Sequence, residues 1–414
     1  MSVKYEKLFE PIKIGPVEIP NRVAVLPIRG VVYNIPGISC PDLDYMCFFT
    51  RRVRGGFGLI VIEGTATHPF ENKYTGGMSY NLYEPKHVAG FKKLTNGIHA
   101  FGGKVFLQLS AGGFGRQYPD ASGTLLPVAA SPIPVNIDPS KMATNEDKTF
   151  LKHHLHWATP KEITTAEIYE LIESHNNATK LAIQAGFDGV EIHCAHGYFG
   201  ANFLSPNQNI RTDEFGGSFE NRNRWMLESI KACMKAIKEM KAEERFVVGV
   251  RTSAEEMTPG GLTKEDVARI HEAAIKEGSS YASLSWGAGF ENHMYTHPMK
   301  ELVPVKVEHA KWFNKRLDIP VIITSLNEPE LAAEVADTCD HVIVGLGRQA
   351  YADPDWPNKV KEGKTQDIVK CLRCNLGCFI NSRLNNGTPE WCVINPEVGY
   401  EGYDHANWPT PKKR

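Results

Sequence analysis

The sequence predicts an α/β protein folded as a (β/α)8 TIM barrel, with a short cysteine-rich extension at the C-terminal end of the chain. Two observations predict the barrel: short apolar, β-branched runs alternate with longer amphipathic stretches, and eight such runs occur. This alternation is typical of βαβ units and a parallel sheet. A third observation predicts the extension, because four of the nine cysteines lie close together near the C-terminus. We expect the barrel to occupy residues 1–363, and the extension with the C-terminal tail to occupy residues 364–414.

The eight expected strands share an apolar, β-branched composition and are, in chain order, Val23–Leu26, Leu59–Glu63, Val105–Leu109, Gly189–His193, Phe246–Arg251, Tyr281–Ser285, Val321–Thr324 and His341–Val344. Amphipathic patterns predict helices between them, of which the clearest are Ile168–Ala185, Arg222–Met240, Lys264–Lys276 and Glu328–Ala336. In such a barrel the functional side chains lie at the C-terminal ends of the strands. The competing architecture, a doubly wound open sheet, would carry a glycine-rich dinucleotide motif after a strand. The nearest candidate, Gly55-Gly56-Phe57-Gly58, precedes its strand, and we interpret it as a turn.

The connection from Ser110 to Thr164 is too long for a turn and is rich in Gly, Pro, Ser and Asn. Because it leaves the C-terminal end of a strand, we expect it to form part of the rim on the substrate side. His153, His154 and His156 raise the hypothesis of a metal site there. No carboxylate or cysteine stands at ligand spacing, so a polar loop is the better explanation.

Composition and charge exclude several classes of protein. The 414 residues carry 46 Lys and Arg against 48 Asp and Glu, and the net charge of -2 argues against a nucleic-acid or acidic-membrane binder. The hydrophobic fraction of 42% and the charged fraction of 23% are ordinary for a globular enzyme. No apolar run approaches the roughly 18 residues of a membrane helix, and no signal peptide is visible. We therefore expect a soluble, cytoplasmic protein, in which clustered thiols indicate metal or redox chemistry rather than disulfides.

The clustered cysteines are the strongest chemical signal. Cys371, Cys374 and Cys378 are separated by two and three residues, and Cys392 follows later. Three local thiolates and one distant thiolate suit a [4Fe–4S] cluster, with one cysteine per iron. A structural zinc site is the alternative, although zinc favours two CxxC pairs.

A second signal follows the fourth expected strand, where His193, His196 and Tyr198 leave its C-terminal end. Two imidazole N–H groups can hold a carbonyl oxygen and stabilise an enolate that develops on it. A phenol beside them can donate a proton to carbon. The alternative explanation is a pair of structural histidines beneath a loop.

Motifs along nearly the whole chain, from about Leu8 to Pro396, resemble the old yellow enzyme family. They are Asn21-Arg22-Val23, Phe203-Leu-Ser-Pro-Asn-Gln-Asn209-Ile-Arg211-Thr-Asp213, Gly216-Gly-Ser-Phe-Glu-Asn-Arg222, Gly347-Arg348 and Asp353-Pro-Asp-Trp-Pro. With the cysteine cluster, the chain is similar to the barrel half of the 2,4-dienoyl-CoA reductase and 2-enoate reductase branch. The resemblance implies a flavoprotein oxidoreductase, an ene-reductase that binds noncovalent FMN and an iron–sulfur cluster.

The resemblance also implies where FMN binds. Pro27 and Ile28 should contact the flavin through their backbone, and Gly64 should allow close approach of the ring. Gln108 should hydrogen-bond the pyrimidine edge, and Arg251 should place a cation near N1.

The phosphate of FMN should bind after the seventh and eighth strands, at Ser325, Gly347 and Arg348. The family usually has a glycine pair after the seventh strand, where this chain has Thr324-Ser325, so the contacts there differ from the family pattern.

By the same resemblance, His193 and His196 bind the substrate oxygen and Tyr198 is the proton donor. The implied reaction reduces the activated C=C bond of an enoate, enone or enoyl-CoA. One departure concerns the residue after Trp286, where the dienoyl-CoA branch commonly has a His and this chain has Gly287, with His293 and His297 further along.

Two other functions remain open. Amine dehydrogenases share this barrel and a cluster, but they attach flavin to a Cys after the first strand, where this chain has Ile28-Arg29-Gly30. An electron-transfer subunit without catalysis is the other alternative, and the presence of His193, His196 and Tyr198 argues against it.

The related multidomain reductases continue into an FAD domain that takes hydride from NAD(P)H. No dinucleotide fingerprint follows the cysteines here, so we expect no second nucleotide domain in this chain. We expect electrons to enter through the cluster from a redox partner, either an FAD-containing subunit or a ferredoxin-like protein, with direct reduction by NAD(P)H as the alternative. A homo-oligomer is also expected.

Overall fold

Eight short runs of aliphatic residues form the strands of a closed parallel barrel, in the order β10-β11-β12-β3-β4-β5-β8-β9. The computed structural model describes residues 3–30, 41–71, 80–110, 126–134, 159–287, 302–380 and 390–402. The barrel strands are β3 (Val23–Val25), β4 (Leu59–Ala66), β5 (Lys104–Ser110), β8 (Gly189–Cys194), β9 (Val247–Ser253), β10 (Tyr281–Ser285), β11 (Val321–Thr324) and β12 (Val342–Leu346). Val344 of β12 pairs with Val23 of β3, which closes the ring. The predicted barrel is confirmed, and the open sheet is excluded.

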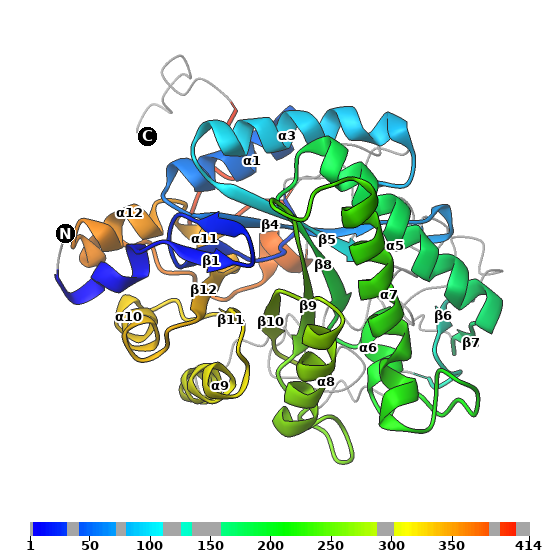
Figure 1. Ribbon diagram of the computed structural model, residues 1–414. Helices are drawn as coiled ribbons and strands as arrows, with labels where there is room; N and C mark the ends of the chain where they lie inside the picture. The colour runs from blue at the N-terminus through cyan, green and yellow to red at the C-terminus, as the bar shows by residue number, and fades with distance from the viewer. Residues whose placement is uncertain are drawn as a thin grey trace.

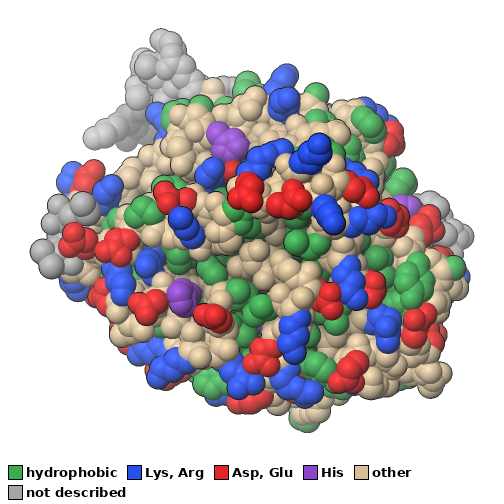
Figure 2. Space-filling model, viewed as in Figure 1, with side chains coloured by type: hydrophobic (Ala, Val, Ile, Leu, Met, Phe, Trp, Pro, Cys, Tyr) green, Lys and Arg blue, Asp and Glu red, His purple; other side chains and the backbone are tan. Residues whose placement is uncertain are grey.

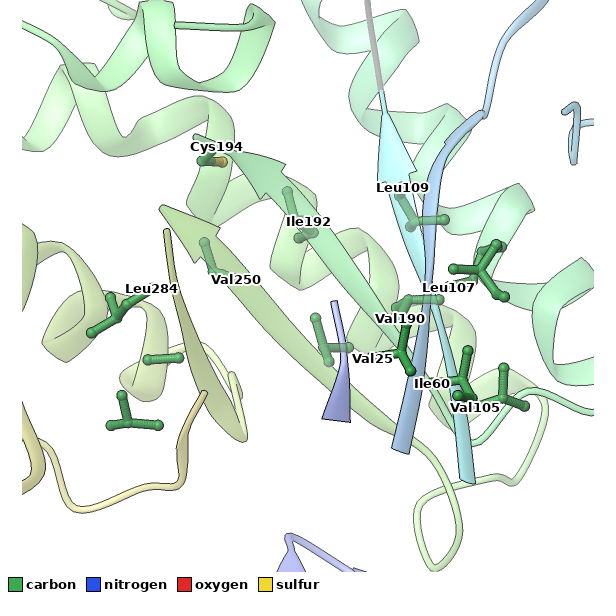
Figure 3. Close-up of a cluster of buried hydrophobic side chains, with 14 of the residues drawn as sticks. Val25, Ile60, Val105, Leu107, Leu109, Val190, Ile192, Cys194, Val250 and Leu284 are labelled. Atoms are coloured by element: carbon green, nitrogen blue, oxygen red, sulfur yellow. The ribbon is translucent and has the colours of Figure 1, made fainter. Parts of the chain in front are cut away.

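Side chains alternate between the two faces of the barrel wall, as strand geometry requires. One set fills the interior and includes Leu59, Val61, Phe106 and Ile343, all fully buried. The other set packs between the strands and the helices and includes Val25 and Val250, and in it Ile60, Leu107 and Val190 lie on the adjacent strands β4, β5 and β8 (Figure 3). Burial on both faces explains why these strands are nearly continuous apolar runs.

A hairpin that the sequence analysis did not predict contributes to the barrel interior. It consists of β1 (Ile12–Ile14) and β2 (Val17–Ile19), which pair antiparallel. Its four isoleucine and valine side chains belong to the interior cluster. At Gly15 an added Cβ would lie 3.2 Å from Val247, at the start of β9, so the hairpin covers the N-terminal end of the strands.

Helices surround the strands (Figure 1). The longer ones are α1 (Leu43–Arg54), α3 (Val88–Ala100), α5 (Thr165–Ala185), α7 (Phe219–Glu239), α8 (Lys264–Lys276), α9 (Leu302–Arg316) and α10 (Pro329–Thr338). Helices α5 and α7 begin three residues earlier than predicted, because Thr164 and Ser218 cap their N-termini. The predicted turn at Gly55–Gly58 is confirmed, since Gly55 caps the end of α1.

Several predicted strand ends and the predicted long loop need correction, and β9, for example, continues past Arg251 to Ser253. Strand β4 continues past Glu63 to Ala66, with a shift in register between Ile62 and Thr65 that marks a β-bulge. Strand β12 continues to Leu346. The predicted loop contains two short strands, β6 (Val128–Ala129) and β7 (Lys161–Glu162), which pair with each other. His153, His154 and His156 lie outside the described residues.

The segment after the barrel packs against α1 and against the short helices α11 (Arg348–Ala352) and α12 (Trp356–Lys361). Arg51 of α1 forms ion pairs with Asp355 and Glu397. Arg52 forms a fully buried ion pair with Glu401. Charged contacts from one helix therefore attach the chain on both sides of the cysteines to the barrel wall.

Positive and negative side chains are interspersed on the face shown in Figure 2, in agreement with the near-balanced charge. Among the described residues, no helix is both long and apolar enough to cross a membrane.

Candidate functional site

Three aromatic side chains meet where β8 ends. His193 is the fifth residue of β8, and the backbone then turns through left-handed conformations at His196 (φ 63°) and Gly197 (φ 72°). Tyr198 follows as the N-cap of α6 (Phe199–Leu204). The ring of His193 lies 5.3 Å from the ring of His196 and 5.3 Å from that of Tyr198, edge-on to both. The structure thus brings the three predicted catalytic side chains together.

His193 is held in one protonation state. Its Nδ1 accepts a hydrogen bond from the backbone N–H of Ala195 at 3.1 Å. Burial, with a smaller effect of the nearby Arg251, lowers the pKa of His193 to about 3. The imidazole is therefore neutral at physiological pH, and its single proton is on Nε2, which is free to act as a donor.

Serines of the two following strands position His196. Its Nε2 lies 2.5 Å from Oγ of Ser285, at the end of β10. Its backbone N–H donates to Oγ of Ser253, which in turn donates to the carbonyl of Gly287. These contacts hold a strained left-handed residue in place, which is a feature typical of functional sites.

A buried polar layer lies inside the barrel beside the histidines. Arg251 donates to Ser283 and Ser285, each at 3.1 Å. Gln108 donates from Nε2 to Glu191 at 2.7 Å. Burial raises the pKa of Glu191, while the positive charge of Arg251 opposes this effect. Glu191 was not predicted, although an acidic residue inside an apolar strand is a visible signal of a buried polar partner.

The predicted flavin contacts Pro27, Ile28, Gly64 and Gln108 lie at or near the C-terminal ends of the adjacent strands β3, β4 and β5. At Gly64, which lies within the bulge of β4, an added Cβ would make only ordinary contacts with Ser110 and with Oε1 of Gln108, at 3.4 and 3.6 Å. Protein neighbours therefore do not require a glycine there. Ile28 packs beside Gly347, whose added Cβ would lie 3.1 Å from it. Pro27 is half-buried at the end of β3.

A polar pocket opens at the ends of β11 and β12, and the predicted Ser325, Gly347 and Arg348 all line it. Ser325 has a φ of 68°, which explains why glycine is usual at this place in the family. The backbone N–H of Ser325 donates to the carbonyl of Gly345, so the hydroxyl is the Ser325 donor that remains to serve a ligand in this pocket. Lys306, Asn327 and Arg373 also line the pocket and were not predicted.

The four clustered thiols line a neighbouring pocket, together with Arg348, Tyr351 and Trp391. Arg348 donates to Asn375 at 2.6 Å, and the backbone N–H of Cys371 donates to Gln349 at 3.0 Å. Burial raises the pKa of Cys378 to about 12, and Arg348 is the cation that opposes this effect. In the described part of the chain, no three His, Cys, Asp or Glu side chains form a group that could hold a metal ion. The four thiols line one pocket, and the iron–sulfur cluster stays a prediction.

Trp286 follows β10 at the rim, where its indole N–H donates to Met257 and its ring packs on His309 at 4.9 Å. The loop histidines His293 and His297 lie outside the described residues.

Comparisons with known proteins show the family to which the chain belongs. Residues 7–367 match the NADH:flavin oxidoreductase / NADH oxidase family. The chain is 34% identical to the NADH oxidase of Thermoanaerobacter brockii, over 99% of this chain and 59% of that protein. It is 31% identical to the cinnamate reductase of Clostridium sporogenes, over 97% of this chain and 59% of that protein.

Among solved structures, a 2-naphthoyl-CoA reductase complex is similar, with a TM-score of 0.78 and 27% identity over 96% of this chain and 58% of that one. The chain thus spans about three-fifths of the length of these relatives. The resemblance to old yellow enzymes is confirmed, and the chain belongs to the NADH:flavin oxidoreductase / NADH oxidase family.

Proposed function

We propose that this chain is an FMN-dependent ene-reductase that reduces the activated C=C bond of an α,β-unsaturated carbonyl compound. The observation that carries the proposal is the group of three rings at the end of β8, where His193, His196 and Tyr198 lie within 5.3 to 6.1 Å of one another. Donors and a proton source at one point suit a carbonyl compound better than any other substrate class.

The two histidines bind the carbonyl oxygen. His193 is neutral and carries its proton on Nε2, so it donates a hydrogen bond to the carbonyl oxygen while the imidazole stays uncharged. His196, fixed by Ser253 and Ser285, supplies a second polar contact. Fixed donors of this kind stabilise negative charge that develops on the oxygen.

Tyr198 donates the proton to the α-carbon. Its side chain is buried and lies edge-on to both imidazoles, so a carbonyl held by the two histidines would lie beside the phenol. Bound FMN supplies hydride chemistry at the β-carbon.

Several residues at the strand ends would hold FMN. Pro27 and Ile28, Gly64, Gln108 and Arg251 lie at or near the C-terminal ends of four barrel strands. Arg251, buried on β9, is the cation that would stabilise a reduced, anionic ring. Ser325, Gly347 and Arg348 would bind the phosphate.

The four cysteines would hold a [4Fe–4S] cluster through which electrons enter from a redox partner. Their thiols line one pocket, and thiolates are the ligands that such clusters use. Leu372, Trp391 and Val393 line the same pocket and are 62%, 42% and 47% exposed. An apolar rim of this kind suits contact with an FAD-containing or ferredoxin-like protein.

The experiment is anaerobic turnover of the purified chain with a reduced one-electron dye as donor. Substrates are a panel of enoates, enones and enoyl-CoA thioesters, with methylated amines tested in the oxidative direction. We expect reduction of at least one unsaturated carbonyl compound, with one FMN and about four irons per chain. Oxidation of amines without alkene reduction would establish the amine-dehydrogenase alternative, and zinc in place of iron would overturn the cluster.

A further inference from the structure

The pocket at the ends of β11 and β12 collects positive charge from three separate parts of the chain. Lys306 comes from α9, Arg348 from the start of α11, and Arg373 from the loop between two of the clustered cysteines. Its other polar side chains are neutral, and no carboxylate stands among the described residues that line it. Three cations around one opening favour a multiply charged anion.

Mutual repulsion among these cations supports that interpretation. Burial, with the neighbouring charges of Arg348 and Arg373, lowers the pKa of Lys306 to about 8. No ion pair or hydrogen bond is formed by the Lys306 side chain within the described residues. A bound anion would offset both the burial and the repulsion.

The backbone of the cysteine loop is held in a strained form that presents Arg373. Arg373 and Asn375, on either side of Cys374, have φ values of 59° and 61°, in the region that normally favours glycine. Asn375 accepts a hydrogen bond from Arg348, and Cys371 donates to Gln349. Both contacts tie the loop to α11, whose first residue is Arg348.

The thiol pocket and the cationic pocket are adjacent, because Cys371 and Arg348 line both. Whatever orders the thiols therefore also orders the loop that carries Arg373.

We propose that Arg373, together with Lys306, binds the phosphate of FMN, so that the cysteine loop forms one wall of the phosphate site. The assignment rests on the proposed FMN site and deepens it. It follows that occupation of the thiol pocket and binding of FMN are coupled, and by linkage each strengthens the other by the same factor.

The first test compares FMN with riboflavin, which lacks the phosphate. The purified full chain is freed of flavin and titrated with either compound, with flavin fluorescence as the readout. Arg373→Gln removes the charge and keeps a side chain at the left-handed position. We expect it to weaken FMN binding by about 10- to 100-fold, the usual value of a charge-assisted hydrogen bond, and to change riboflavin binding by less than about twofold.

Lys370→Gln is the matched control, because Lys370 is exposed, pairs with Glu328 and lies outside the pocket. It should leave the affinities for FMN and riboflavin as in the wild type. Equal losses for FMN and riboflavin in Arg373→Gln, or no loss for FMN, would overturn the proposal.

The second test measures the coupling through a double-mutant cycle of Cys374→Ser and Arg373→Gln. We expect Cys374→Ser to weaken FMN binding. Adding Arg373→Gln to that variant should lower the affinity for FMN little further. Independent, multiplicative losses would show that the loop does not couple the two pockets. If circular dichroism shows that Cys374→Ser does not fold, removal of iron from the wild-type chain with a chelator gives the same comparison.

Failure of this inference differs from failure of the proposed function. A chain that binds FMN and reduces an alkene, while Arg373→Gln keeps the ratio of FMN to riboflavin affinity, refutes the role of Arg373 alone. A chain that binds neither flavin refutes the FMN site itself.

Discussion

The ring group at the end of β8 and the cationic pocket at the ends of β11 and β12 are assembled in opposite ways. His193, His196 and Tyr198 lie within one short stretch of chain, and contacts to Ser253 of β9 and Ser285 of β10 fix His196. Lys306, Ser325, Arg348 and Arg373 come from four separate segments. His193 is neutral, since burial lowers its pKa to about 3, whereas the pocket concentrates positive charge.

The ligands proposed for the two regions would account for the difference. A carbonyl oxygen that gains charge only during the reaction needs aligned neutral donors, and a rigid strand end aligns them. A permanently charged phosphate needs net positive charge, which one short segment cannot supply without strong self-repulsion. Substitutions in each region should therefore have separable effects on rate and on cofactor retention.

The largest effect is expected at the ring group. Tyr198→Phe should slow alkene reduction by about 10²- to 10⁴-fold, the usual contribution of a positioned general acid, and should leave FMN and iron content unchanged. Single-turnover reduction of a substrate identified by the panel measures the effect. A wild-type rate under conditions where proton transfer limits turnover would exclude Tyr198 as the donor.

A large effect on stability is expected where the cysteine segment is attached to the barrel. Arg52→Met leaves Glu401 buried without its partner, which costs roughly 3–5 kcal/mol of unfolding free energy. Urea unfolding measures this loss, and iron content shows whether the segment stays docked. Arg54→Met, on the exposed face of α1, is the control and should change stability by less than about 0.5 kcal/mol. Equal stability of the two variants would contradict the assigned role of the buried pair.

A smaller effect is expected for the oxygen-binding donor. His193→Ala should weaken binding of phenols, which perturb the flavin spectrum, by about tenfold. Because the pKa of the folded His193 lies near 3, well below its ordinary value of 6.5, the imidazole stays neutral between pH 5 and 8. The affinity of the wild-type chain for a phenol should therefore not change near pH 6.5 through titration of His193. The pH profiles of the wild type and of His193→Ala should have the same shape there. A change near pH 6.5 in the wild type alone would mean that His193 titrates and is not a fixed neutral donor.

The smallest effect is expected at Ser325. Its φ of 68° is strained for any residue with a Cβ, so Ser325→Gly should raise stability by no more than about 1 kcal/mol. Ser325→Ala keeps the strain and removes the hydroxyl, so it should weaken FMN binding and leave riboflavin binding unchanged. Thermal unfolding and flavin titration separate the two contributions. A loss of stability in Ser325→Gly would contradict the strain argument.

Local patterns in the sequence determined the barrel and the ring group. Continuous aliphatic runs predict strands buried on both faces, and alternation with amphipathic stretches predicts the parallel barrel. His193, His196 and Tyr198 could be identified because a strand end and a tight turn are encoded by neighbouring residues. Helix starts at Thr165 and Phe219 were missed by three residues, because the capping contacts of Thr164 and Ser218 precede the apolar pattern.

Tertiary structure alone decided which distant residues share a pocket. Nothing near Lys306 in the sequence marks it as a partner of Arg373, since the two meet only when the barrel closes and the cysteine segment packs on α11. Glu191 likewise finds its buried hydrogen-bond donor only when β5 places Gln108 beside it. The bulge at Gly64 depends on the register between β4 and β5, which a single strand does not encode. Periodicity reports which face of an element is buried, whereas the partners across that face depend on the closed ring.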